Sequence, residues 1–326
     1  YIVRDGDGNV VSRERVDATS AAFGRRSYDV SRPELMHLLL SKFKEIGGVF
    51  HGGAALQSVA VISNDKGGLG LAEIKFESGL TVHTPSLIAA DGIHSRVRKQ
   101  LFDEIPPSYP GISLVYGILP GCAGLVADEP DSFQMMLADD FSVLTSHYQG
   151  ANPSTWFAVL SRSEAPLLGR SVWAEEGKSE TEAGAVALLN SLPTLRTAFL
   201  EQPSTQPRFI YSGGLQTRDL RPDFRWHKGP VLLIGDAVHG LTPWGGYSGQ
   251  MAVEDAYVVA EYHADATCFA DIEATRRPRV LEFQNKSVDQ KADGLGEGDA
   301  VAKGEFTSLL TRPINRYPYL LVSLYS

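Results

Sequence analysis

The segment from Gly229 to Tyr262 constrains the fold of this chain more than any other. Four apolar residues, Val231–Ile234, lead directly into Gly235 and Asp236, and a glycine-rich loop then precedes a helical pattern carrying Glu254–Asp255. This order is typical of a cofactor site, because glycine lets the backbone approach a ligand closely. The start of the following helix also offers unpaired N–H groups and a partial positive charge. The alternative is an ordinary strand–loop–helix turn, which we consider less well supported because strand, carboxylate and glycines follow in order.

Two further segments carry polar residues at the ends of predicted elements. Leu87–Ala90 is a short apolar strand that ends in Asp91 and Gly92, although such a pair is also a common turn. Arg32 opens a helix predicted over residues 31–46, with Ser31 as N-cap and a glutamate three residues later as its capping-box partner. A surface arginine at a helix start is the alternative for Arg32.

The distribution of predicted elements indicates an α/β protein with two interleaved domains. Residues 1–106 and 220–290 form the predicted cofactor domain, residues 107–219 a β-rich domain, and residues 291–326 a C-terminal segment. We expect an N-terminal hairpin around residues 5–8, a helical stretch over 181–200 broken near Pro193, a helix over 280–288 opened by Arg276–Arg279, and a flexible loop over 290–305. Strands are predicted at 59–62, 71–76, 80–83, 87–90, 115–119, 132–138, 141–148, 155–160 and 231–234.

Composition excludes several classes of function. The net charge of −9 argues against nucleic acid as a partner, since phosphate repulsion would not be offset. Cys122 and Cys268 are the two cysteines and lie far apart, which indicates neither a disulfide scaffold nor a metal site. No apolar run approaches the roughly 20 residues that span a bilayer. We therefore expect a cytoplasmic protein without a membrane span.

These motifs together resemble those of the FAD-dependent aromatic hydroxylases, the para-hydroxybenzoate and salicylate hydroxylase type. The family's Gly-Asp motif matches Gly235, Asp236, His239, Pro243, Gly246, Asp255 and Ala256. Its Asp-Gly motif matches Asp91, Gly92, Ser95 and Arg98. Its helix-opening arginine matches Arg32. Two positions depart from the pattern: Ser248 stands where a glycine is expected, and Gln250 stands where an asparagine is expected. The matches extend over roughly residues 27–290.

The resemblance implies a flavoprotein monooxygenase. In the family, NAD(P)H reduces FAD, the reduced flavin activates O₂, and one oxygen atom enters an electron-rich substrate. For this chain it implies hydroxylation or epoxidation of an aromatic or polyketide-like small molecule, of the kind found in secondary metabolism. The implied cofactor-binding residues are Arg32, Asp91, Gly92, Gly235, Asp236, Pro243, Gly245, Gly246, Tyr247, Ser248 and Gly249. Asp236 is expected at the ribityl or pyrophosphate region of FAD.

The catalytic residues stay open. His239, Tyr116 and His147 are candidates, and each has an alternative role in core packing or at a helix start. Tyr148, Trp156 and Trp244 could line a substrate site and have the same alternative. No metal-ligand cluster is expected.

The family's first βαβ unit, with its Gly-x-Gly-x-x-Gly motif for the FAD pyrophosphate, has no counterpart in this sequence. We therefore expect an incomplete Rossmann-like domain that begins inside the family's fold, with a partner or a homodimer covering the exposed sheet edge. The missing Gly-x-Gly-x-x-Gly motif and the departures at Ser248 and Gln250 lead to a second hypothesis. The protein could be derived from a flavoenzyme, no longer hold FAD, and act as a non-redox cyclase, isomerase or small-molecule binder.

Overall fold

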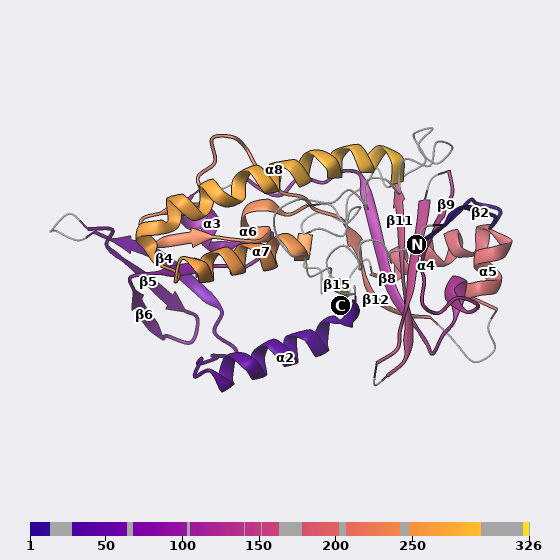
Figure 1. The fold of residues 1–326 in the computed structure, drawn as a ribbon, viewed down its shortest axis with the longest axis horizontal. Helices are drawn as coiled ribbons and strands as arrows, with labels where there is room; N and C mark the ends of the chain where they lie inside the picture. The colour runs from indigo at the N-terminus through magenta and orange to yellow at the C-terminus, as the bar shows by residue number, and fades with distance from the viewer. Residues whose placement is uncertain are drawn as a thin grey trace. The chain divides into compact units, whose positions relative to one another are not determined.

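The structure is a computed structural model that describes residues 1–13, 28–63, 68–102, 105–139, 141–150, 152–162, 178–201, 207–241, 248–294 and 322–325. The chain divides into two compact units (Figure 1). Unit 1 contains Tyr1–Ser31, Tyr109–Leu215 and Asp289–Ser326, and unit 2 contains Arg32–Ser108 and Gln216–Val288. The inner boundaries lie within a few residues of the expected ones. The N-terminal boundary differs, because residues 1–31 belong with the β-rich unit and not with the cofactor domain.

Strand pairing explains why the N-terminal residues join unit 1. Strands β1 (Ile2–Arg4) and β2 (Val10–Arg13) form the antiparallel hairpin expected there. β1 also pairs in parallel with β9 (Phe133–Leu137), so that Val3 lies opposite Met135. Both side chains are buried with Leu137, and this small apolar cluster fixes the hairpin on the sheet. Such a pairing between distant segments leaves no local signal in the sequence.

A mixed seven-stranded sheet forms the centre of unit 1, in the order β12–β8–β11–β10–β9–β1–β2. The remaining strands are β8 (Ile112–Pro120), β10 (Phe141–Tyr148), β11 (Ser154–Arg162) and β12 (Arg208–Gly214). Unit 1 also holds η1 (Gly124–Val126), α4 (Lys178–Ser191), α5 (Pro193–Phe199) and the parallel pair β3 (Tyr28–Ser31) and β15 (Val322–Tyr325). The strands predicted over 115–160 and the helix break at Pro193 are confirmed.

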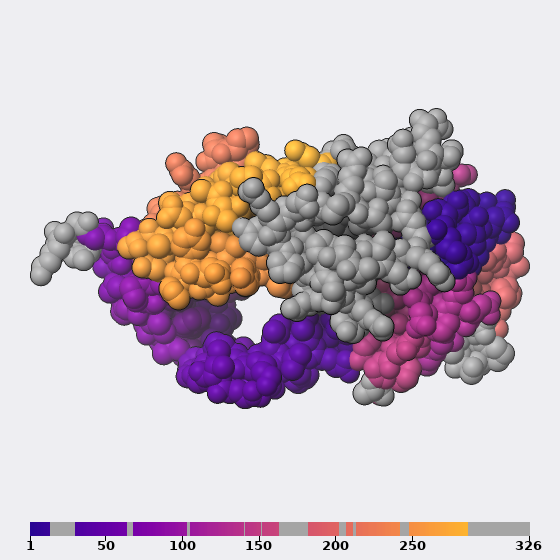
Figure 2. All heavy atoms as spheres, in the orientation of Figure 1, coloured from indigo at the N-terminus to yellow at the C-terminus, as the bar shows by residue number. Residues whose placement is uncertain are grey.

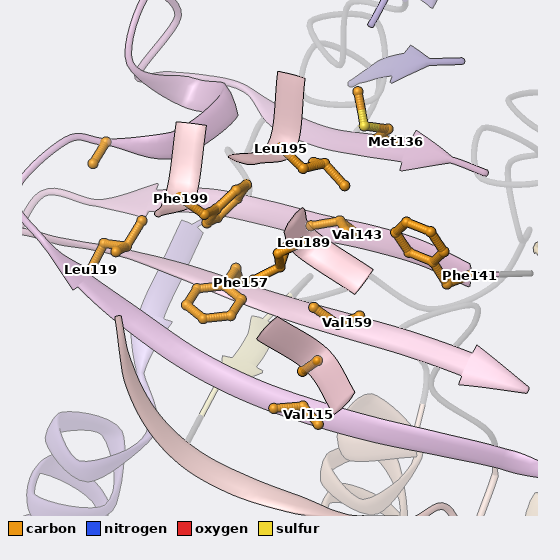
Figure 3. Packing of buried hydrophobic residues seen from close by; sticks show 12 residues of the cluster. Val115, Leu119, Met136, Phe141, Val143, Phe157, Val159, Leu189, Leu195 and Phe199 are labelled. Atoms are coloured by element: carbon orange, nitrogen blue, oxygen red, sulfur yellow. The ribbon is translucent and has the colours of Figure 1, made fainter. Parts of the chain in front are cut away.

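The core of unit 1 lies between this sheet and helices α4 and α5. Side chains from alternate positions of the strands point toward the helices, as the two-residue period of a strand requires (Figure 3). Phe157 is fully buried and its ring contacts the ring of Phe199 at a centroid distance of 5.2 Å. The cluster consists of Val115, Leu119, Ala123, Met136, Phe141, Val143, Phe157, Val159, Ala185, Leu189, Leu195 and Phe199.

Unit 2 contains two small sheets and the helices that flank them. One sheet is antiparallel and contains β4 (Leu56–Ile62), β5 (Leu71–Phe76) and β6 (Thr81–Thr84). The other has the order β13 (His227–Lys228), β14 (Val231–Leu233) and β7 (Leu87–Ala89), with β14 parallel to β7. The helices are α2 (Arg32–Glu45), α3 (Arg96–Leu101), α6 (Asp236–His239), α7 (Ser248–Glu261), η3 (Ala266–Cys268) and α8 (Phe269–Gly294), of which the residues up to Val288 belong to unit 2. These bounds confirm the strands and the helix predicted over residues 31–90.

Helix α8 departs from the prediction at both ends. It starts at Phe269 and runs through Pro278 to Gly294, whereas the sequence predicted a helix over 280–288 and a loop from 290. Phe269, Ile272, Val280 and Phe283 share one buried face of the helix. Burial of this face outweighs the cost of a proline inside the helix, which local preference alone does not predict.

Helix α2 has no buried residue. Met36, Leu38, Leu39 and Phe43 each expose 44–58% of their surface. Figure 2 shows open space between α2 (indigo) and the orange surface that α7 forms. An apolar helix surface of this extent is unusual on a folded unit.

Truncating Phe157 tests the core of unit 1. We expect Phe157→Ala to lower the free energy of unfolding by about 3–5 kcal/mol, because the fully buried ring would leave a cavity. Val11→Ala on β2 is the control, since Val11 is 42% exposed and should change the same quantity by under about 1 kcal/mol. Urea denaturation followed by circular dichroism measures both. Equal losses for the two variants would contradict this assignment of the core.

Candidate cofactor site

The parallel pairing of β7 and β14 brings the two Asp/Gly motifs to one edge of a sheet. Leu233 lies opposite Ala89, and the Ile234 amide donates to the Ala89 carbonyl at 3.0 Å. Both strands end at this point, so Asp91–Gly92 and Gly235–Asp236 follow adjacent carboxyl ends. In open α/β sheets, ligands bind at that edge.

Gly235 forms a turn that requires glycine. Its φ is +58°, a left-handed conformation that is costly for other residues. A Cβ at this position would lie 3.3 Å from the Cβ of Ala252 on α7. The Gly235 carbonyl accepts from the amides of Val238 and His239, both at 2.9 Å. The turn therefore starts α6 and also lets α7 pack closely against it.

Asp236 presents a half-buried carboxylate in the first turn of α6. Its Oδ1 accepts from the Ser248 hydroxyl at 2.8 Å, and Ser248 is the first residue of α7. Ser248 is one of the two positions that depart from the family pattern, and its hydroxyl occupies one oxygen of this carboxylate. The other oxygen remains able to accept a ligand hydroxyl.

Asp91 uses its carboxylate within its own turn. Oδ1 accepts from the Ser95 hydroxyl at 2.6 Å and Oδ2 accepts from the Val97 amide at 3.1 Å. Ser95 also caps α3, because its Oγ accepts from the Arg98 amide at 2.9 Å. These bonds shape the Asp-Gly turn, where Gly92 has a φ of +79° and a Cβ would meet no atom within 4 Å.

Arg98 connects this turn to the Gly-Asp turn. Its side chain is buried, and Nη1 donates to the carbonyls of Ala237 and Val238 at 3.1 and 3.2 Å. The guanidinium also lies over the ring of Phe224, 3.9 Å from the centroid. A cation at the carbonyl side of a helical turn is favourable electrostatically. The two motifs are thus joined by side-chain contacts as well as by strand pairing.

A buried carboxylate, Asp255 on α7, holds the Gly-Asp turn in place. Its side chain is 0% exposed. Oδ2 accepts from the Gly235 amide at 2.8 Å and is 2.7 Å from His239 Nε2, while Oδ1 accepts from Arg276 Nε at 2.8 Å. Burial opposes the charge of Asp255, but the neighbouring His239 and Arg276 outweigh it and hold the pKa of this carboxyl below its ordinary 3.8. The carboxylate is therefore charged at neutral pH.

Arg276 is itself held by α7. Nη1 donates to Glu254 Oε2 at 2.6 Å, and Nη2 donates to the Met251 carbonyl at 3.3 Å. Arg279 also donates to both oxygens of Glu254, each at 2.9 Å. The basic segment of α8 therefore ties α8 to α7, which agrees with a structural role for these arginines.

A second buried carboxylate, Glu273, supports the start of β13. Oε2 accepts from the Trp226 amide at 2.9 Å and lies 2.9 Å from His227 Nδ1. Oε1 accepts from Arg277 at 2.6 Å. Burial raises the pKa of Glu273, but Arg277, the Trp226 amide and His227 outweigh it, and the net result lies below the ordinary 4.5. Neither Glu273 nor the Asp255 contacts were anticipated from the sequence. For the Asp255 contacts, the one signal in the sequence is the spacing of the acidic pair 254–255 after the Gly-Asp turn.

The three candidate catalytic residues belong to different units. His239 is fully buried in unit 2, with Nε2 on Asp255 and its ring 5.5 Å from that of Trp226. Tyr116 and His147 lie in unit 1 on opposite faces of the sheet, since Tyr116 pairs with Ala158 and His147 pairs with Thr155. Their assignment as catalytic groups stays a prediction.

Tyr116 belongs to an aromatic cluster on the sheet face away from α4 and α5. It stacks on Trp156 at a centroid distance of 6.2 Å, and Trp156 contacts Phe133 at 5.9 Å. Burial raises the pKa of the Tyr116 hydroxyl. The hydroxyl is therefore neutral at physiological pH. His147, on the helix-covered face, has a buried Nδ1 without a hydrogen-bond partner in the described part of the chain.

The remaining predicted site residues divide into two groups. Arg32 is exposed at the first position of α2, and Gly249 is half-buried in the first turn of α7. Pro243, Gly245, Gly246 and Tyr247, together with Trp244, lie outside the described residues. In the described ranges, no helix is long and apolar enough to cross a membrane, and no group of three or more His, Cys, Asp or Glu side chains could hold a metal ion.

The sequence matches a family model described as "FAD binding domain" over residues 6–266. This match includes both motifs and most of both units. The chain belongs to the FAD binding domain family. The residues present fit the cofactor in one respect that the structure shows directly: a left-handed glycine and a half-buried carboxylate stand at the carboxyl end of a parallel strand.

Known relatives are similar over part of their length. The chain is 31% identical over 194 residues to a chloroplastic zeaxanthin epoxidase of an Oncidium hybrid cultivar, covering 56% of this chain and 26% of the relative. It is 27% identical over 191 residues to the 6-methylsalicylate 1-monooxygenase atA of Aspergillus terreus, covering 57% of this chain and 40% of the relative. The chain thus spans less than half of these two relatives.

A solved structure shows the same fold. It is Klebsiella pneumoniae HpxO complexed with FAD and uric acid, which matches 95% of this chain and 76% of its own, with a TM-score of 0.71 and 20% identity. The mixed α/β fold predicted from the sequence, a Rossmann-like cofactor domain interleaved with a β-sheet domain, is confirmed.

Substituting Gly235 tests the turn. We expect Gly235→Ala to lower the free energy of unfolding by about 1–2 kcal/mol, because alanine is strained at positive φ and its Cβ would press on Ala252. Gly184→Ala in α4 is the matched control, since a Cβ there meets no atom within 4 Å. Alanine in that helix should raise stability by about 0.5–1 kcal/mol. Urea denaturation gives both values, and a stabilised Gly235→Ala would refute the left-handed turn.

Glu273 predicts a pH dependence of stability. Because its folded pKa lies below the ordinary 4.5, its contribution is complete above pH 4.5 and is lost as the pH falls through the folded pKa. Glu273→Gln should therefore cost about 2 kcal/mol at pH 7. The difference from the unaltered chain should shrink below pH 4.5. Urea denaturation across this range measures it, and a difference that grows on acidification would be the wrong sign.

Proposed function

We propose that this chain is part of a flavin-dependent monooxygenase that uses NAD(P)H and O₂ to hydroxylate or epoxidise an aromatic or polyketide-like small molecule. The single observation that carries the proposal is the placement of the Gly-Asp and Asp-Gly turns at adjacent carboxyl ends of β14 and β7, in a chain of the FAD binding domain family. The relatives named above include an epoxidase and a 6-methylsalicylate monooxygenase, which supports both reaction type and substrate class.

The residues at this edge would bind and orient the cofactor. The second carboxylate oxygen of Asp236, Oδ2, would accept from a ribityl hydroxyl, or from a group near the pyrophosphate. The first turn of α7, from Ser248, would place unpaired N–H groups and a partial positive charge beside the cofactor. When bound, FAD would supply the redox chemistry between NAD(P)H and O₂, in which one oxygen atom enters the substrate and the other leaves as water.

Aromatic residues of unit 1 are the candidates for substrate contact. Tyr116, Trp156 and Phe133 form one aromatic face of its sheet, and the edges and faces of aromatic rings suit a flat, electron-rich molecule. HpxO, which has the same fold, was solved in complex with FAD and with uric acid, a flat heteroaromatic molecule. A cytoplasmic location and a homodimer stay predictions from the sequence.

The second hypothesis, a flavoenzyme-derived protein without FAD, has one observation in its favour. The Ser248 hydroxyl donates to Asp236 and so competes with a ligand for that carboxylate. Such a protein would bind a small molecule at the aromatic face of unit 1 without redox chemistry.

Flavin retention separates the two hypotheses. We expect the purified 326-residue chain to bind added FAD, with visible absorption bands that stay with the protein on gel filtration. Asp236→Ala should weaken FAD binding about tenfold, which corresponds to the loss of one hydrogen bond to a charged group. Asp219→Ala is the control, because Asp219 lies outside both motifs and should leave the affinity unchanged.

NAD(P)H oxidation then tests the reaction. Oxidation that is stimulated by simple phenols, with oxygen incorporated into the product by mass spectrometry, supports the monooxygenase. A chain that cannot be reconstituted with FAD, yet binds phenols with unchanged structure, would favour the second hypothesis.

A further inference from the structure

Asp255 is the residue through which the turn, α7 and α8 meet. Its carboxylate contacts Gly235 in the turn, His239 at the end of α6 and Arg276 on α8. We propose that Asp255 is a positioning residue for the cofactor: it sets the distance between the Gly235–Asp236 turn and the start of α7, and so the place where Asp236 presents its carboxylate. This inference rests on the proposed FAD function.

Hydrogen bonds hold both the amide and the carbonyl of Gly235. The Gly235 amide donates to Asp255, and the Gly235 carbonyl accepts from Val238 and His239. A left-handed glycine without such bonds would have several conformations of similar energy, because glycine populates positive and negative φ about equally. With them, the next residue, Asp236, has one defined direction.

Helix α7 is tied to the turn at two points. Ser248 at its start donates to Asp236, and Asp255 lies seven residues further on, two helical turns along the same face. Ala252 lies between them and packs against Gly235. A change at Asp255 would therefore alter the separation of Asp236 from the first turn of α7, although the Asp255 side chain itself is fully buried.

The charge of Asp255, and not only its shape, is required. All three groups around it donate: the Gly235 amide, His239 Nε2 and Arg276 Nε. An asparagine has one acceptor oxygen and one donor NH₂, so its NH₂ would face either Arg276 or the Gly235–His239 pair. Arg276, which is 3% exposed, would also lose the fully buried one of its two counter-charges and keep Glu254.

Glu273 provides a matched control. It is also a buried carboxylate that accepts from a backbone amide and an arginine and lies beside a histidine ring. Its amide partner is Trp226, at the start of β13, and not the Gly-Asp turn. Loss of its charge should therefore reduce stability without moving Asp236.

The experiment is a double-mutant cycle on FAD affinity, measured by the quenching of FAD fluorescence during titration of the full chain. Asp255→Asn should raise Kd at least tenfold, and Glu273→Gln should leave it within about twofold, while both lower the urea midpoint. The double variant Asp255→Asn/Asp236→Ala should have a Kd close to that of the single variant with the higher Kd, because Asp255 acts through Asp236. The proposal would be overturned if the fold-changes in Kd of the two single variants multiplied in the double variant, or if Asp255→Asn left Kd unchanged.

Hydrogen exchange of the FAD-free chain separates this proposal from the proposed function. Asp255→Asn should speed exchange in the peptide containing Gly235 more than in the peptide containing Trp226, and Glu273→Gln should do the reverse. If the unaltered chain binds no FAD, the proposed function fails, and this comparison still decides whether Asp255 fixes the turn. If Asp255→Asn does not fold, Arg276→Lys takes its place, and uniform exchange across both peptides would overturn the proposal.

Discussion

A buried carboxylate that accepts three N–H groups holds the candidate site together. Asp255 receives the amide of the Gly235 turn, the ring of His239 and the guanidinium of Arg276. Removing one partner from a buried ion pair costs about 3–5 kcal/mol, because the remaining charge stays out of water. This group holds the turn, and together with Glu254 it attaches α8 to α7.

Strand pairing supplies the other constraint. Because β7 and β14 are parallel and adjacent, two motifs about 140 residues apart in the sequence end at the same edge of a sheet. Arg98 then joins α3 to the carbonyls of α6. The Asp-Gly motif also has a structural role, because Asp91 shapes its own turn and holds Ser95, which caps α3. Within the described part of the chain, the Asp236 carboxylate accepts from Ser248 through Oδ1.

Local patterns in the sequence predicted much of this. The apolar run 231–234, the strands of the β-rich unit and the break at Pro193 follow from periodicity and from the chemistry of proline and glycine. The parallel pairing of β1 with β9 did not, because it joins residues about 130 positions apart through three buried side chains. The course of α8 through Pro278 depends on a buried face that tertiary packing creates. The contacts of Asp255 were missed for the same reason, since they unite a turn, α7 and α8.

We propose that FAD lies at the carboxyl ends of β7 and β14, against Asp236. A crystal structure of the chain with FAD tests it most directly. We expect electron density for the cofactor beside the Gly235 turn, with a ribityl hydroxyl or a group near the pyrophosphate within hydrogen-bond distance of Asp236, and with Asp255 still bonded to the Gly235 amide. Density for FAD at another place, with Asp236 bonded to Ser248 alone, would contradict the account.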